Sequence, residues 1–239
     1  FWIRVIMRTI ANVGGVVAMG VAGLCLAGSA KSEGPTLSTY GTPGLVELPT
    51  AEVFDDGTLS FGIAYSGLTL RNTATFQVLP RIQGSFRYSI TDEFFMSDPL
   101  AGSGDLYDRS FDIQILVSKE TDGFPAVAIG LRDFLGTGIL SSEYVVATKT
   151  MTEGLAISGG LGWGRLAGRN SFDNPLSFLG LESEDRDTGF TGTGGQVEAA
   201  RWFQGRAAFF GGVNWNVADN ISVQLEYSPD IYLRETRFG

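Results

Sequence analysis

The strongest constraint on the fold of this chain is an alternation of apolar and polar residues with a period of two. In the stretch SFDIQILVSK, every second residue from Phe111 to Val117 is apolar, which places these side chains on one face of an extended strand. The pattern recurs in nine segments: 59–66, 73–79, 82–90, 110–119, 125–132, 143–150, 155–164, 206–215 and 221–228. Helical periodicity is nearly absent, so the sequence predicts an all-β fold.

The connections between these segments alternate in length. They are short after residues 79, 120, 150 and 215, and longer after residues 90, 132 and 164. An antiparallel transmembrane β-barrel has this organisation, with short periplasmic turns and long outer loops. The segments 91–109 and 165–194 are then expected to face the cell exterior. A soluble β-sandwich is the alternative, because its strands also alternate apolar and polar residues.

Residues 1–30 have the features of a secretory signal peptide. Two arginines precede an acid-free apolar run, and small residues lead up to Ala30, after which a signal peptidase would cleave. A single membrane anchor is the alternative, since the run approaches the length of a membrane-spanning helix. Lipid attachment at Cys25 is disfavoured, because the large residue Leu24 precedes it.

The predicted organisation has three parts: a signal peptide at 1–30, a periplasmic N-terminal segment at 31–57, and an outer-membrane β-barrel at 58–239. Nine strands is an odd number, whereas bacterial single-chain barrels have even strand numbers. An open strand edge in lipid would also leave backbone groups unpaired at high cost. We therefore expect this barrel to be an incomplete part of a longer one, with further strands beside 59–66 and 221–228.

The composition excludes several kinds of site. The chain contains no histidine, which removes imidazole-based triads and histidine metal sites. Its single cysteine, Cys25, lies within the predicted signal peptide. A net charge of −9 without any basic run argues against binding to nucleic acid. We therefore expect no catalytic residue, no metal site and no cofactor.

Charged residues within the predicted strands are the candidate site. A Lys or Arg on a lipid-facing strand at the membrane midplane costs about 2–4 kcal/mol, so the strand register is expected to turn such charges toward the lumen. There they would pair with one another or line the interior of the barrel. The candidate lumen-lining residues are Arg87, Asp112, Arg132, Glu143, Lys149 and Glu226.

Several long motifs resemble those of one protein family. They are YGTPGLVELPTAE (40–52), DRSFDIQILVSKETDGFPAVAIGLRDFLGTG (108–138), SSEYVVATK (141–149), GLGWGRLAGR (160–169) and FFGGVNW (209–215). In these motifs the chain resembles the YjbH family of exopolysaccharide- and capsule-associated outer-membrane β-barrel proteins. The resemblance implies a place in the bacterial outer membrane, in contact with its lipid. It also implies a role in exopolysaccharide or capsule production or export beside other polysaccharide-secretion proteins, without a characterised enzymatic reaction.

Two other functions remain open at this point. A polysaccharide hydrolase or lyase would use two converging carboxylates in the lumen, and the chain is rich in carboxylates, although their sequence positions do not show that any two converge. A general diffusion porin would have the same strand pattern, and only the family resemblance disfavours it. We expect a non-enzymatic protein that assists exopolysaccharide production or export.

Overall fold

The computed structural model describes residues 4–9, 34–95, 103–138, 140–180, 186, 196–197, 199–218 and 221–232. These residues form β-strands and three short 3-10 helices. In chain order they are β1 (Arg4–Thr9), β2 (Leu59–Ser66), β3 (Thr69–Leu79), β4 (Ile82–Phe95), β5 (Ser103–Ser118), β6 (Ala126–Gly136), β7 (Ser142–Thr152), β8 (Leu155–Trp163), η1 (Gly164–Ala167), η2 (Ser177–Leu179), β9 (Gln196–Val197), η3 (Ala199–Arg201), β10 (Ala207–Ala218) and β11 (Ile221–Tyr227).

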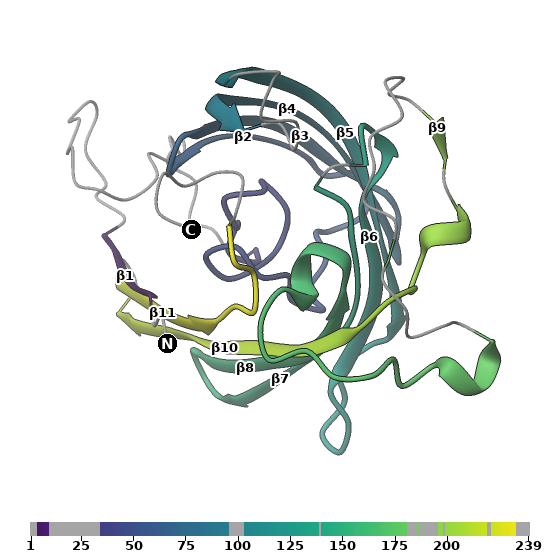
Figure 1. Ribbon diagram of the computed structural model, residues 1–239. Helices are drawn as coiled ribbons and strands as arrows, with labels where there is room; N and C mark the ends of the chain where they lie inside the picture. Colours follow the sequence, from purple (N-terminus) through teal and green to yellow (C-terminus); the bar gives the residue numbers. More distant parts are fainter. Residues whose placement is uncertain are drawn as a thin grey trace.

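The strands form one antiparallel sheet that curls around a central space (Figure 1). Its order is β1-β11-β10-β8-β7-β6-β5-β4-β3-β2, and the short β9 pairs with the end of β6. β2 and β1 are the two edges, and among the described residues β2 pairs only with β3. The all-β, antiparallel prediction is confirmed, whereas the sheet is not closed into a barrel.

Each of the nine predicted segments is a strand, but several strands are longer than predicted. β4 extends to Phe95 and β5 starts at Ser103, so most of the expected loop at 91–109 is paired strand. Residues 91–95 and 103–109 alternate poorly in hydropathy, and only their cross-strand hydrogen bonds reveal them as strands. The sequence also did not predict β1, which lies within the expected signal peptide and pairs with β11. Residues 10–30 lie outside the described residues.

The two faces of the sheet have opposite chemistry. Large apolar side chains cover the outer face and are exposed there, as in Phe61 (72% exposed), Trp215 (51%) and Ile129 (37%). The inner face is buried and is polar except for an apolar part, mainly on β6, β7 and β10. Its polar residues include Arg71, Thr73, Thr75, Gln83, Ser85, Arg87, Ser89, Ser110, Asp112, Gln114, Arg132, Ser222, Gln224 and Glu226. Strand alternation thus produces a sheet whose polar side faces inward, the reverse of a β-sandwich.

Residues 34–53, here called the interior segment, fill much of the central space (Figure 1). The segment folds on itself through backbone hydrogen bonds such as Thr39 N–H to Val46 O (2.7 Å) and Leu45 N–H to Leu48 O (2.9 Å). Residues 31–57 were predicted as a periplasmic N-terminal segment, and that location stays a prediction; within the structure, residues 34–53 pack inside the curled sheet. Their apolar side chains join inner-face residues in one cluster: Leu45, Leu48, Ala51, Leu116, Ala126, Ala128, Tyr144, Val146, Leu166 and Phe210.

The long connection after β8 packs against one end of the outer face. Phe172 forms a bridge with Ala207, and the Phe203 ring meets the buried Trp163 ring edge-on at 5.1 Å. The connection also supplies Arg186, whose guanidinium binds Glu143 at 2.5 Å. This connection buries one end of the outer face, including Trp163 and Ala207, whereas the remainder of that face is exposed. No helix among the described residues combines the length and apolarity needed to cross a membrane.

Candidate interior binding site

Three arginines from different strands surround one tyrosine of the interior segment. The guanidinium carbons of Arg71 on β3 and Arg87 on β4 lie 4.7 Å from the centre of the Tyr40 ring, and that of Arg132 on β6 lies at 4.1 Å. Tyr40 is 4% exposed and each arginine is at most 4% exposed. We call Arg71, Arg87 and Arg132 the arginine cluster. A cation–π contact of this kind is worth about 0.5–2 kcal/mol.

A glycine lets the interior segment come close enough for these contacts. Gly41 has a φ of +73°, and a Cβ atom at this position would lie 2.6 Å from the Thr73 Cβ. Thr75 Oγ1 donates a hydrogen bond to the Gly41 carbonyl at 2.9 Å. The left-handed conformation and the close approach both favour glycine here, so Tyr40 is placed against the sheet by its neighbour in sequence.

One carboxylate compensates the arginine cluster directly. Asp112 on β5 accepts two hydrogen bonds from Arg87, at 2.5 and 3.2 Å, and a third from the Asp133 backbone N–H at 2.8 Å. Two further acids lie nearby but bond elsewhere. Asp108 accepts from the Thr137 hydroxyl at 2.8 Å, and Asp133 accepts from the Leu140 backbone N–H at 3.2 Å.

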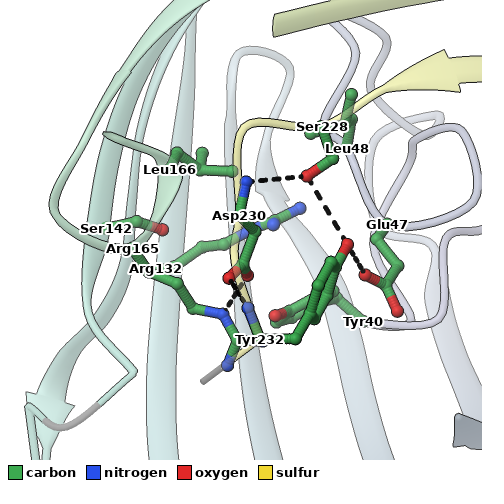
Figure 2. Close-up of a pocket in the computed structure, with 10 residues that line it drawn as sticks. All are labelled: Tyr40, Glu47, Leu48, Arg132, Ser142, Arg165, Leu166, Ser228, Asp230 and Tyr232. Atoms are coloured by element: carbon green, nitrogen blue, oxygen red, sulfur yellow. Dashed lines mark hydrogen bonds and ion pairs between the residues drawn. The ribbon is translucent and has the colours of Figure 1, made fainter. Parts of the chain in front are cut away.

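Arg132 also lines a small pocket between the interior segment and the residues after β11 (Figure 2). There the Tyr232 hydroxyl donates to Glu47 at 2.5 Å, and Arg165 forms an ion pair with Asp230. Burial raises the pKa of Tyr232, and the adjacent Glu47 carboxylate raises it further. Tyr232 is therefore a neutral donor at neutral pH, and both pocket carboxylates have partners.

Glu226 on β11 holds the turn of the interior segment. Its Oε2 accepts hydrogen bonds from the backbone N–H groups of Glu47 at 2.9 Å and Leu48 at 3.2 Å. At 3% exposure this carboxylate is buried. Hydrogen bonds to a charged acceptor contribute more than neutral ones, about 1.5–3 kcal/mol. β11, the last strand in the chain, therefore anchors the interior segment, which precedes β2.

Several buried polar atoms near the arginine cluster have no partner among the described residues. They include Arg132 Nη2, the hydroxyl oxygens of Ser85, Ser89 and Ser110, and one carboxylate oxygen each of Asp108 and Asp133. The serines lie on the same inner-face patch, because Arg87 is flanked by Ser85 and Ser89 on β4 and pairs with Ser110 on β5. Buried polar groups are normally hydrogen-bonded, so this patch has unused capacity for water or a ligand.

The structure separates the six predicted lumen-lining residues. Arg87, Asp112, Arg132 and Glu226 lie on the inner face and are buried, and the first three are close together. Glu143 and Lys149 were expected to face inward, but they share the outer face with Val145 and Ala147.

Local partners explain this correction. Glu143 is near one end of β7, where Arg186 and the Phe203 backbone N–H bind it. Lys149 is near the other end, where it donates to Glu120 at 2.9 Å. A charge near a strand end can be satisfied by the adjacent connections and need not turn inward.

The buried carboxylates of the interior differ in their partners. Asp112 is tied to Arg87, and Glu226 is bound by two backbone N–H groups. Two further buried carboxylates, Asp108 and Asp133, lie near Asp112, and burial raises the pKa of both. Among the residues that the structure describes, no three acidic, histidine or cysteine side chains group as a metal site would require. What the interior offers is hydrogen-bonding and cationic groups.

Sequence reasoning missed two members of the site. Arg71 lies outside the predicted segment 73–79, because the alternation weakens at the start of β3. Tyr40 lies in an irregular segment without periodicity. Its position inside YGTPGLVELPTAE, a motif rich in glycine and proline, was the only available signal.

The protein is a curled antiparallel sheet with an apolar outer face, and its interior is filled by residues 34–53 of the same chain. The chain belongs to the YjbH family, described as exopolysaccharide biosynthesis protein YbjH, which matches residues 36–238. The family resemblance of its motifs is thereby confirmed. It is similar to a protein of Escherichia coli (strain K12) named "Uncharacterized lipoprotein YjbH", with 28% identity over 224 residues. The match covers 92% of this chain and 32% of that relative, so the chain spans about a third of the relative's length. No solved structure matches the chain.

Proposed function

We propose that this chain forms part of an outer-membrane β-barrel protein that assists the production or export of exopolysaccharide. The family provides the link to exopolysaccharide biosynthesis. The name of the Escherichia coli relative, a lipoprotein, is consistent with a place in the cell envelope. The proposed role is non-enzymatic, and it is supported by the way Asp112 is paired with Arg87 and Glu226 is bound by backbone N–H groups.

The observation that carries the membrane part of this proposal is the exposed apolar outer face. Side chains such as Phe61, Ile129 and Trp215 point away from the sheet on strands far apart in its order. Soluble monomers rarely expose contiguous apolar patches beyond a few hundred Å². An apolar outside with a polar inside is the distribution of a membrane barrel.

A general diffusion porin is less compatible with the interior. Porins keep a water-filled channel, whereas here the interior segment packs Leu45 and Leu48 against the inner face, each only 1% exposed. We therefore favour a role in which the interior is occupied at rest.

Two experiments test the proposal. The protein should fractionate with the outer membrane and should migrate differently on detergent gels when heated, as folded barrels do. Deletion of the gene, with polysaccharide quantified separately in cells and medium, should lower the amount in the medium. Recovery of the folded protein in the soluble periplasmic fraction would refute the membrane assignment, and unchanged polysaccharide would refute the role.

A further inference from the structure

We propose that the inner-face patch around the arginine cluster is a binding subsite for carboxylate-bearing sugars of a polysaccharide, which Tyr40 of the interior segment occupies in the resting state. This inference rests on the proposed function and adds a ligand class to it. It also assigns the interior segment a role as a competing occupant of that subsite.

The charge balance of the cluster is the first argument. Asp112 forms an ion pair with Arg87, whereas Arg132 meets the same Tyr40 ring without a carboxylate partner among the described residues. Arg132 is 4% exposed, and its Nη2 has no hydrogen-bond partner among the described residues. Burying an arginine costs more than its cation–π contacts return, here those of Arg132 with Tyr40 at 4.1 Å and Tyr144 at 5.7 Å. A ligand carboxylate would accept two charge-assisted hydrogen bonds from the Arg132 guanidinium.

The surrounding hydroxyl groups are the second argument. Ser85, Ser89 and Ser110 surround Arg87 on the same face, and their buried hydroxyl oxygens have no partner in the part of the chain that is described. Hydroxyls both donate and accept, as sugar hydroxyls do. A patch that combines a guanidinium fork with several free hydroxyls suits an acidic sugar better than a simple anion.

The way Tyr40 is held is the third argument. The ring contributes no charge, so it covers the guanidiniums without neutralising them. Its segment is fixed by a few discrete bonds, including those from Thr75 to Gly41 and from Glu47 and Leu48 to Glu226. A ligand must therefore displace Tyr40, and its apparent affinity for the resting protein is lowered by the fraction of time that the ring is in place.

Binding measurements on the full-length protein in detergent test this inference. The probes are oligogalacturonate, which carries a carboxylate on each sugar, and a malto-oligosaccharide of equal length. Tyr40→Ala should bind oligogalacturonate at least tenfold more tightly than wild type, and Tyr40→Phe should match wild type because it keeps the ring. Arg132→Gln added to Tyr40→Ala should abolish the gain. Neither variant should change binding of the neutral oligomer.

Controls separate the other outcomes. Tyr65→Ala removes a half-exposed tyrosine from the outer face and should leave binding unchanged. If Tyr40→Ala is unfolded by circular dichroism, Tyr40→Leu carries the same expectation. The inference is overturned if the folded variant shows no gain for oligogalacturonate, if the neutral oligomer gains equally, or if inorganic phosphate binds with the same gain. Outer-membrane fractionation tests the proposed function and does not depend on these binding results. A failure of either proposal can therefore be told from a failure of the other.

Discussion

At the scale of single residues, one glycine determines how closely the interior segment approaches the sheet. Gly41 combines a positive φ with contact against Thr73, whereas Gly57 has a similar φ of +77° and nothing within 4 Å of its missing side chain. The two positions therefore separate backbone strain from steric overlap.

We expect Gly57→Ala to lower the free energy of unfolding by about 1–2 kcal/mol through the left-handed backbone alone. Gly41→Ala should lower it by a further 1–3 kcal/mol or so, because its Cβ also overlaps Thr73. Urea unfolding in detergent, followed by tryptophan fluorescence, measures both. Equal losses for the two variants would show that residue 41 does not pack against β3.

Glu226 is the second residue whose role can be isolated. Glu226→Gln keeps the size of the side chain but removes the charge that strengthens the hydrogen bonds from Glu47 and Leu48. We expect the free energy of unfolding to fall by about 1–2 kcal/mol. The matched control is Glu153→Gln in the exposed turn between β7 and β8, which should have no effect. A stable Glu226→Gln variant would contradict the role of this carboxylate as an anchor.

Sequence alternation gives the facing of the strand charges correctly, whereas the rule that charges turn away from lipid fails near strand ends. The residues next to Arg87 and Asp112 in sequence are apolar, and this alternation alone assigns both charges to the polar face. Glu143 and Lys149 follow the same alternation as Val145, and were expected inward only because charge in lipid is costly. Their partners, Arg186 and Glu120, come from connections whose paths the sequence does not reveal.

At the scale of elements, strands with regular alternation were predictable and irregular segments were not. All nine alternating segments form strands, because period-two hydropathy matches the two faces of a sheet. The interior segment has no period, and its path depends on tertiary bonds such as Thr148 Oγ1 with the Ala51 N–H at 2.8 Å. No local pattern encodes contacts of that range.

The outer face of β6 permits a test of its surroundings. Ile129 is 37% exposed near the middle of β6, and Met151 is 56% exposed near the end of β7. In lipid, Ile129→Arg should cost about 2–4 kcal/mol and impair assembly, whereas Met151→Arg should cost at most about 1 kcal/mol. The fraction of heat-modifiable protein in outer membranes measures this difference. If both variants assemble like wild type, the outer face meets water.

At the scale of the whole molecule, the sheet encloses the interior segment of the same chain. The interior segment contacts strands on opposite sides of the curled sheet, with Tyr40 against β3, β4 and β6 and Glu47 against β11. A protein with this interior should conduct ions poorly, unlike an open channel.

Leu45→Asp combined with Leu48→Asp should release the interior segment, because two carboxylates cannot remain in the apolar cluster without partners. We expect the variant to show ion conductance in planar lipid bilayers and the wild type to show little. Leu59→Asp on the exposed outer edge strand serves as a comparison for general loosening. High conductance in the wild type would mean that the interior segment leaves a continuous path.

The bond between Glu226 and the interior segment also governs the order in which the molecule can form. The hydrogen bonds from Glu47 and Leu48 to Glu226 span 179 and 178 positions of the sequence. The segment is therefore near the start of the chain, whereas its anchor is near the end. Contacts of such long range form slowly, because the entropy cost of closing the loop comes before the contacts stabilise the structure. The strands therefore assemble around a segment whose turn at Glu47 and Leu48 is fixed only when β11 is added. Assembly should pass through a late stage in which the sheet is present while its interior is still open and hydrated.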